Sequence, residues 1–236
     1  HEQIEQVFED RLLNVHGTRL PQGRGGAPIS WQIMMGSKLG YCQLHRVAPQ
    51  LDEGDIILTE EFLYSPAAYK PKHFILEYNQ HNVRFLQKFI IEITTKQTNF
   101  ESLKQPSYLS TYYPRLDSQN NSWIDWDDPV ESLSRFICAF DDPYSGAQTL
   151  LNGSQISVKT VQVEYSDPRF HSYQAGLIYR KNDNWICVCA NGGSLVISEI
   201  IDQDGKNIIA HMKLGDRLFT PRNLLDERLD RRFFRP

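Results

Sequence analysis

The stretch from Leu12 to Asp55 constrains most strongly what this chain folds into and what it does. It begins with a short apolar run in which Asn14 and His16 stand two residues apart. Side chains at positions i and i+2 of a strand share one face, so this amide and imidazole are expected to point the same way. Asp52 follows in a polar connection. A doubly wound parallel sheet gathers strand ends at one edge, which predicts that the three side chains meet there.

Helices and strands alternate along this stretch and beyond it. A turn rich in glycine, proline and arginine leads to a predicted helix over 27–35, with Pro28 near its start and Gly36 as its stop. Strands are predicted over 41–47 and 55–62.

Two further segments have helical spacing. Apolar residues recur at three- and four-residue steps over about 72–94, which predicts a long helix whose polar members, including His73, Glu77 and His81, face solvent. Residues 1–11 show the same spacing and are expected to end a helix that leads into the first strand.

Three motifs stand in order along the first quarter of the chain. They read Asn-x-His, Leu-Pro-x-x-Arg-Gly and Leu-Asp-x-Gly-Asp-Ile, and their residues are Asn14, His16, Leu20, Pro21, Arg24, Gly25, Leu51, Asp52, Gly54, Asp55 and Ile56. This series resembles the signature of the formyltetrahydrofolate-dependent formyltransferases. That family includes methionyl-tRNA formyltransferase, glycinamide ribonucleotide formyltransferase and the sugar N-formyltransferases. The doubled Gly25-Gly26 and the segment 30–33 are most similar to the branch that acts on nucleotide-linked amino sugars.

The resemblance implies an α/β fold in four parts. These are the C-terminal part of a Rossmann-like formyltransferase domain, a linker with a connecting helix, a small β-rich domain similar to an OB barrel, and a charged tail, over 1–110, 111–150, 151–222 and 223–236. In the family, a set of alternating strands and helices precedes the catalytic strand, and apart from the helix end over 1–11 none of that set is visible here. The sequence is therefore expected to be a fragment, and its first strand is expected to lack a sheet neighbour.

The second half of the chain changes from helical to alternating spacing. Asp128, Pro129 and Glu131 predict a capped helix start, and this helix should run to about Phe140. From Gln155 the apolar period is two, with turn residues between the runs. Five strands are predicted, over 156–163, 175–179, 185–190, 194–201 and 207–211.

Formyl transfer from a folate nitrogen to an amine is an acyl transfer, and the resemblance implies a role for each motif residue. Asn14 would donate to the oxyanion, His16 would move protons, and Asp52 would orient His16. Arg19 and Arg24 are positioned to meet an anionic substrate, with salt bridges inside the loop as the alternative. N10-formyltetrahydrofolate is the implied co-substrate. No residue is assigned to its binding, and no metal is expected.

Composition narrows the choice of partners. The net charge is -4 and the pI is about 6.0, which predict no general attraction to nucleic acid or to an anionic membrane. No apolar run approaches the roughly 20 residues that span a bilayer. The four cysteines form no Cys-x-x-Cys pair and fit neither a zinc site nor a disulfide framework, so reduced thiols in a cytoplasmic protein are predicted.

Three functions remain open. The leading one is a sugar N-formyltransferase that acts on a dTDP- or UDP-linked amino sugar, expected as a homodimer and in lipopolysaccharide biosynthesis. Methionyl-tRNA formyltransferase is the alternative, but residues 140–220 carry seven basic against nine acidic residues, which argues against an RNA partner. The third is a non-catalytic fragment of such an enzyme.

His45, which ends a strand-like run, is expected to lie next to the site residues and to support them without acting in catalysis itself.

Overall fold

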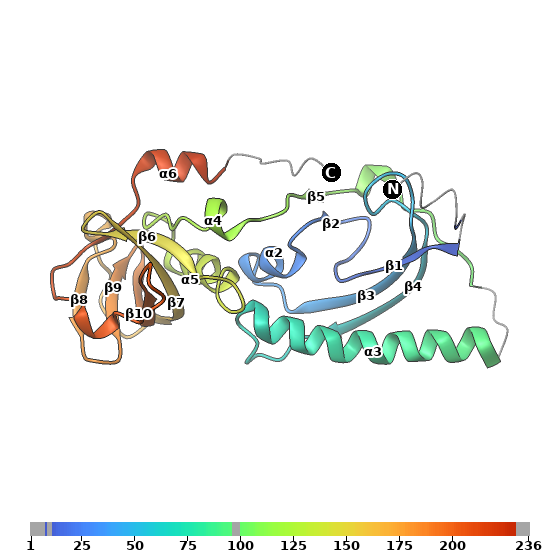
Figure 1. The fold of residues 1–236 in the computed structure, drawn as a ribbon, viewed down its shortest axis with the longest axis horizontal. Coiled ribbons are helices and arrows are strands. Elements are labelled where there is room, and N and C mark those ends of the chain that lie inside the picture. Colours follow the sequence, from blue (N-terminus) through green and yellow to red (C-terminus); the bar gives the residue numbers. More distant parts are fainter. Residues whose placement is uncertain (1–7, 9–10, 96–99, 230–236) are drawn as a thin grey trace. The chain divides into compact units, whose positions relative to one another are not determined.

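The computed structural model describes residues 8, 11–95 and 100–229 (Figure 1). The chain divides into two compact units, with residues 33–36 and 69–72 grouped with 116–236, and the remainder up to 115 in the first unit. The helix expected over 1–11 lies almost entirely outside the described residues. No helix formed by the described residues is long and apolar enough to cross a membrane.

Three antiparallel strands form the sheet of the first unit. They are β1 (Leu13–His16), β3 (Leu39–Arg46) and β4 (Ile56–Leu63), in the order β1-β3-β4. The expected parallel sheet is wrong for these strands. A short loop joins β3 to β4 and permits only an antiparallel pair, whereas the connection from β1 to β3 is long enough for either direction. Among the described residues, β1 pairs with a strand on one side only.

Short elements fill the connection from β1 to β3. β2 (Arg24–Gly25) pairs in parallel with β5 (Tyr112–Tyr113), which brings the arginine turn beside a segment far away in sequence. α2 (Pro28–Met34) then follows and confirms the helix predicted over 27–35. Gly36 ends it as expected, with a positive φ of 69° that favours glycine.

The long helix α3 (Pro71–Thr95) confirms the prediction over 72–94 and runs alongside β3 and β4 (Figure 1). Its anchors are Phe74 and Phe85, each only 1% exposed. Four further apolar residues on the helix are more than half exposed: Leu76, Val83, Ile90 and Ile91. The helix therefore buries one stripe and leaves another apolar stripe uncovered by the described residues.

The expectation that the polar residues of α3 face solvent is wrong for the three residues it named, although others such as Lys72, Asn79 and Arg84 are exposed. The His81 ring stacks on Phe62 of β4 with ring centroids 4.0 Å apart. The Glu77 carboxylate accepts a hydrogen bond of 2.8 Å from the backbone N–H of Ser65. His73 is half-buried as well. An aromatic strand residue and a free N–H at the strand end supply partners that helical spacing alone does not reveal.

The second unit is built on a six-stranded antiparallel sheet in the order β11-β6-β7-β10-β9-β8. The strands are β6 (Ala147–Leu151), β7 (Ser154–Glu164), β8 (Ile178–Lys181), β9 (Ile186–Ala190), β10 (Gly193–Ile201) and β11 (Leu218–Phe219). A bridge between Leu177 and Arg217 links the two ends of this order, so the sheet curls toward a barrel. The strands predicted over 156–163, 185–190 and 194–201 are confirmed, whereas the one predicted over 175–179 overlaps β8 only at residues 178–179, and β6 and β11 were not predicted. The strand predicted over 207–211 is wrong, since Ile209–His211 forms a 3-10 helix.

Helices accompany this sheet. α5 (Val130–Ala139) matches the predicted helix to about Phe140, and Leu133 and Ile137 are fully buried in it. Its predicted cap is wrong, because Pro129 occupies the N-cap position and makes no side-chain cap bond. The backbone N–H of Val130 instead donates to the carbonyl oxygen of Asn191, across to the sheet. The short helices α4 (Ser118–Asn121) and α6 (Arg222–Glu227) complete the unit.

A carboxylate held by two lysines stabilises the second unit. Asp142 pairs with Lys70 at 2.8 Å and with Lys159, and both ammonium groups are nearly buried. The hydrogen bonds from Lys159 and then Lys70 lower the pKa of Asp142 to about 2. This ion-pair stabilisation is present above the ordinary pKa of an aspartate and is lost as the pH falls through about 2.

Asp142→Asn is expected to lower the free energy of unfolding by about 1–2 kcal/mol, since both lysines lose a charged partner while solvent screens part of the effect. Urea denaturation at pH 7 measures it, with the exposed Asp183→Asn as the matched control. Because the loss comes from a carboxylate that ionises only above about pH 2, the difference between wild type and Asp142→Asn should shrink as the pH is lowered toward that value. An unchanged midpoint at pH 7 would contradict the assignment.

Candidate functional site

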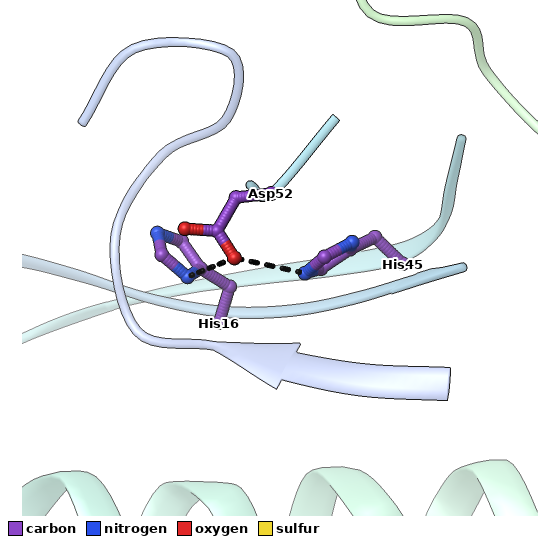
Figure 2. A group of neighbouring side chains, drawn as sticks. All are labelled: His16, His45 and Asp52. Atoms are coloured by element: carbon purple, nitrogen blue, oxygen red, sulfur yellow. Dashed lines mark ion pairs between the residues drawn. The ribbon is translucent and has the colours of Figure 1, made fainter. Parts of the chain in front are cut away.

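The predicted site residues lie around the end of β1. Asn14 and His16 come from β1, and Asp52 comes from the loop between β3 and β4. Figure 2 shows the Asp52 carboxylate between two imidazoles, those of His16 and His45. Asp52 Oδ1 is 3.9 Å from His16 Nδ1 and 3.9 Å from His45 Nε2. The structure thus brings His16 and Asp52 together directly, whereas Asn14 reaches the group through His45.

Hydrogen bonds of Nε2, the ring nitrogen that does not face Asp52, fix the orientation of the His16 ring. The Thr18 hydroxyl donates to the carbonyl oxygen of Gly23 at 2.8 Å. His16 Nε2, 2.7 Å from that hydroxyl and 3.1 Å from the same carbonyl oxygen, must therefore carry its own hydrogen. In the neutral ring Nδ1 then carries no hydrogen, and its lone pair faces Asp52. A proton taken up there would lie beside a carboxylate in a site where His16 is only 7% exposed.

The two carboxylate oxygens of Asp52 have different surroundings. The backbone N–H of Gly25 donates to Oδ2 at 3.0 Å, which leaves Oδ1 to face the histidines. The residue itself has a positive φ of 54°, a conformation that side-chain-bearing residues seldom adopt outside functional or tightly held turns. The anchored oxygen fixes the direction of the free one.

Two motif glycines are required by close backbone approaches. A Cβ at Gly25 would lie 2.2 Å from the carbonyl oxygen of Tyr113, the partner residue in β5. A Cβ at Gly54 would lie 1.8 Å from the carbonyl oxygen of Arg46. The spacing Leu-Asp-x-Gly therefore places Asp52 at the point where the loop folds back onto the end of β3.

Arg24 holds this loop in place through hydrogen bonds of its side chain. Its guanidinium donates to Glu53 Oε1 at 2.9 Å and to Gln105 Oε1 at 2.8 and 3.2 Å, and the residue is 6% exposed. Gln105 in turn donates to the carbonyl oxygens of Asp52 (2.8 Å) and Gly54 (2.7 Å). These contacts agree with the alternative of bridges inside the loop. Sequence reasoning missed Gln105, since it belongs to none of the three motifs and no spacing relates it to them.

Arg19, the other cation predicted to meet the substrate, is exposed at the turn after β1. Its guanidinium lies near Tyr41, whose pKa is raised above its ordinary value, first by burial and then by the nearby Glu61. Arg19 thus remains accessible from solvent, while Arg24 does not.

His45 joins the site from β3. It is 2% exposed, and its Nε2 is 3.1 Å from Asn14 Nδ2. Burial is the main cause that lowers its pKa, so the ring is neutral at neutral pH. Asn14, by contrast, is exposed and can meet a ligand. The site therefore combines an accessible amide with buried groups behind it.

The nitrogen and oxygen atoms that converge here are of a type that can bind a metal. Atoms of His16, His45 and Asp52 all lie within 4.8 Å of one another. However, the two 3.9 Å separations exceed the roughly 3.4 Å expected between ligands of a tetrahedral ion with bonds of about 2.1 Å. The side chains would have to move closer to hold one. As they stand, the His16 imidazole faces the Asp52 carboxylate, and the amide of Asn14 lies nearby on His45.

Family comparisons match both parts of the chain. The family model "Formyl transferase" matches residues 2–70, and "Formyl transferase, C-terminal domain" matches residues 118–214. The methionyl-tRNA formyltransferase of Coprothermobacter proteolyticus is 30% identical over 169 residues, covering 68% of this chain and 51% of that protein. The one of Acidovorax ebreus is 28% identical over 195 residues, covering 82% and 58%. The chain thus spans little more than half the length of these curated relatives.

Solved structures with the same fold include WlaRD, described as a sugar 3N-formyl transferase in the presence of dTDP and 5-N-formyl-THF. Its TM-score is 0.61 at 19% identity, covering 80% of this chain and 65% of that one. An N-formyltransferase from Helicobacter canadensis, with folinic acid and dTDP-3-aminofucose, has a TM-score of 0.61 at 18% identity, covering 80% and 66%. HypX from Aquifex aeolicus, in complex with tetrahydrofolic acid, has a TM-score of 0.57 at 18% identity, covering 84% of this chain and 34% of that one. These likenesses confirm the predicted fold class, a Rossmann-like part followed by a β-rich domain.

Proposed function

We propose that this chain, which belongs to the formyl transferase family, carries the acid–base centre of an N-formyltransferase. In this proposal the enzyme moves the formyl group of N10-formyltetrahydrofolate to the amine of a nucleotide-linked amino sugar. The observation that carries the proposal is the His16–Asp52 pair, held beside the accessible amide of Asn14. The likeness to structures that hold a folate and dTDP or a dTDP-sugar supports both substrates.

The geometry suits each step of an acyl transfer. The neutral amine attacks the formyl carbon, a carbon–nitrogen bond forms, and the formyl oxygen gains a negative charge that the Asn14 N–H stabilises. His16 Nδ1 takes a proton from the attacking nitrogen, and Asp52 stabilises the resulting imidazolium. The same proton then passes to N10 of the folate as the bond from N10 to the formyl carbon breaks. The products are a formamide and tetrahydrofolate.

The charge balance of the second unit favours a small acceptor over tRNA. Residues 140–220 carry seven basic against nine acidic residues, and two of the seven, Lys159 and Arg180, are paired with carboxylates. A nucleic-acid surface needs cations that are free to neutralise several phosphates. Methionyl-tRNA remains the second candidate acceptor, because the sequence relatives with the higher identities are methionyl-tRNA formyltransferases.

Full-length protein supplied with N10-formyltetrahydrofolate is expected to release tetrahydrofolate with dTDP- or UDP-linked amino sugars and not with methionyl-tRNA. The same sugars with an acetylated amine are the matched control, since they keep the nucleotide and lose the nucleophile. Turnover with methionyl-tRNA alone would move the assignment to the second candidate. An absence of transfer to either acceptor would support the non-catalytic alternative.

A further inference from the structure

We infer that His45 is a positioning residue that determines which end of the Asn14 amide faces the transferred formyl group. The inference rests on the proposed function, in which Asn14 stabilises the oxyanion. The carboxamide of Asn14 has an NH2 end and an oxygen end of almost equal shape, and only the NH2 end stabilises a negative charge. A residue that selects one orientation therefore acts on the rate without touching the substrate.

Hydrogen bonding sets the donor and acceptor roles of the His45 ring. Its Nδ1 lies 2.8 Å from the carbonyl oxygen of Arg46, an atom that can only accept, so Nδ1 carries the hydrogen. In the neutral ring Nε2 is then an acceptor. The atom 3.1 Å from Nε2 is Asn14 Nδ2, which donates one of its two hydrogens. A rotated amide would set its oxygen against the Nε2 lone pair, so this arrangement excludes the wrong orientation.

The sheet places the two residues for this contact. Asn14 and His45 are directly opposite each other in the register of β1 and β3, the closest relation that a sheet offers to two side chains. On its other side β3 has a register irregularity between Leu44 and His45 in its pairing with β4, a feature that redirects side chains. His45 is thus buried and fixed, whereas Asn14 is exposed on its outer side. The second N–H of Asn14 remains available for a ligand.

His45→Phe is the decisive substitution, since phenylalanine keeps the ring and removes the acceptor. It is expected to lower kcat by about 10²-fold, within the range for loss of an oxyanion donor, with little change in KM. His45→Gln restores an acceptor oxygen near the position of Nε2 and should recover most of the loss. Cys42→Ala, at a fully buried site on the same strand, shows the effect of disturbing β3 alone.

A double-mutant cycle tests whether His45 acts through Asn14. Asn14→Ala and the double variant Asn14→Ala/His45→Phe should be equally slow, because without the amide there is nothing left to orient. If the two losses multiply, or if His45→Phe is as active as wild type, the inference is overturned. The same holds if His45→Gln is no faster than His45→Phe.

A measurement independent of turnover separates this inference from the proposed function. Nitrogen NMR of the wild-type full chain should show His45 with its hydrogen on Nδ1 and a hydrogen-bonded side-chain N–H of Asn14. A hydrogen on Nε2 would overturn the inference even in an active enzyme. An inactive protein with the expected NMR pattern would instead refute the proposed function and leave the Asn14–His45 arrangement standing.

Discussion

His16→Ala is expected to lower kcat of formyl transfer by about 10²–10⁴-fold, the range for loss of a positioned general acid–base group. Asp52→Asn should cause a loss of similar size for a different reason. The amide of the new asparagine can present an N–H to His16 Nδ1, which then cannot take up the proton of the attacking amine. Single-turnover kinetics measure both effects.

Asp55→Asn is the matched control, because it removes a carboxylate from the same loop that lies against Ser102 rather than His16. It should keep kcat within a few-fold of wild type. Circular dichroism and thermal melting should show that all three variants remain folded. Full activity in His16→Ala would show that the imidazole performs no step of the reaction.

Gly54→Ala is the second substitution with a large expected effect. The added Cβ would meet the carbonyl oxygen of Arg46 at 1.8 Å, a backbone atom that cannot move aside alone. We expect a loss of about 3 kcal/mol in the free energy of unfolding, at the upper end of overpacking effects, together with loss of activity as the loop displaces Asp52. Urea denaturation and the formyl-transfer assay measure the two effects.

Gly205→Ala provides the comparison for that glycine. It has a positive φ of 78° but open space around the added Cβ. It should cost about 1–2 kcal/mol through backbone strain alone and leave formyl transfer unaffected. Equal effects of the two substitutions would show that the close approach at Gly54 is relieved by a small backbone shift.

Local pattern predicted the elements whose residues decide their own structure. The apolar spacing of α3 places Phe74 and Phe85 on one face, and the helix forms as expected. Strand direction was not accessible in the same way, because alternation along β1 is the same for a parallel and an antiparallel neighbour. The segment from Asn207 also alternates, yet the Asn207 side chain accepts from the backbone N–H of Ile209 and starts a 3-10 helix instead.

In the candidate site too, local pattern predicted one part of the arrangement, and tertiary structure sets the other part. The motif placed His16 and Asp52 at one point, and the structure has them 3.9 Å apart. The role of Arg24 depends on Gln105, which is 81 residues away and enters through the pairing of β2 with β5. A contact of that kind is set by tertiary structure, so no spacing within the motif could have revealed it.

The long helix α3 should show a steep gradient of amide hydrogen exchange along its length. Phe74 and Phe85 anchor its first and middle turns, whereas Ile90, Ile91 and Ile93 near its end are each more than 40% exposed. Amides with few buried neighbours open in small local fluctuations, long before the whole domain unfolds. Protection factors in this chain should therefore fall by several orders of magnitude from the middle of α3 to its last turns. The helix would then behave as two cooperative segments, a slow-exchanging one on the sheet and a fast-exchanging one beyond it.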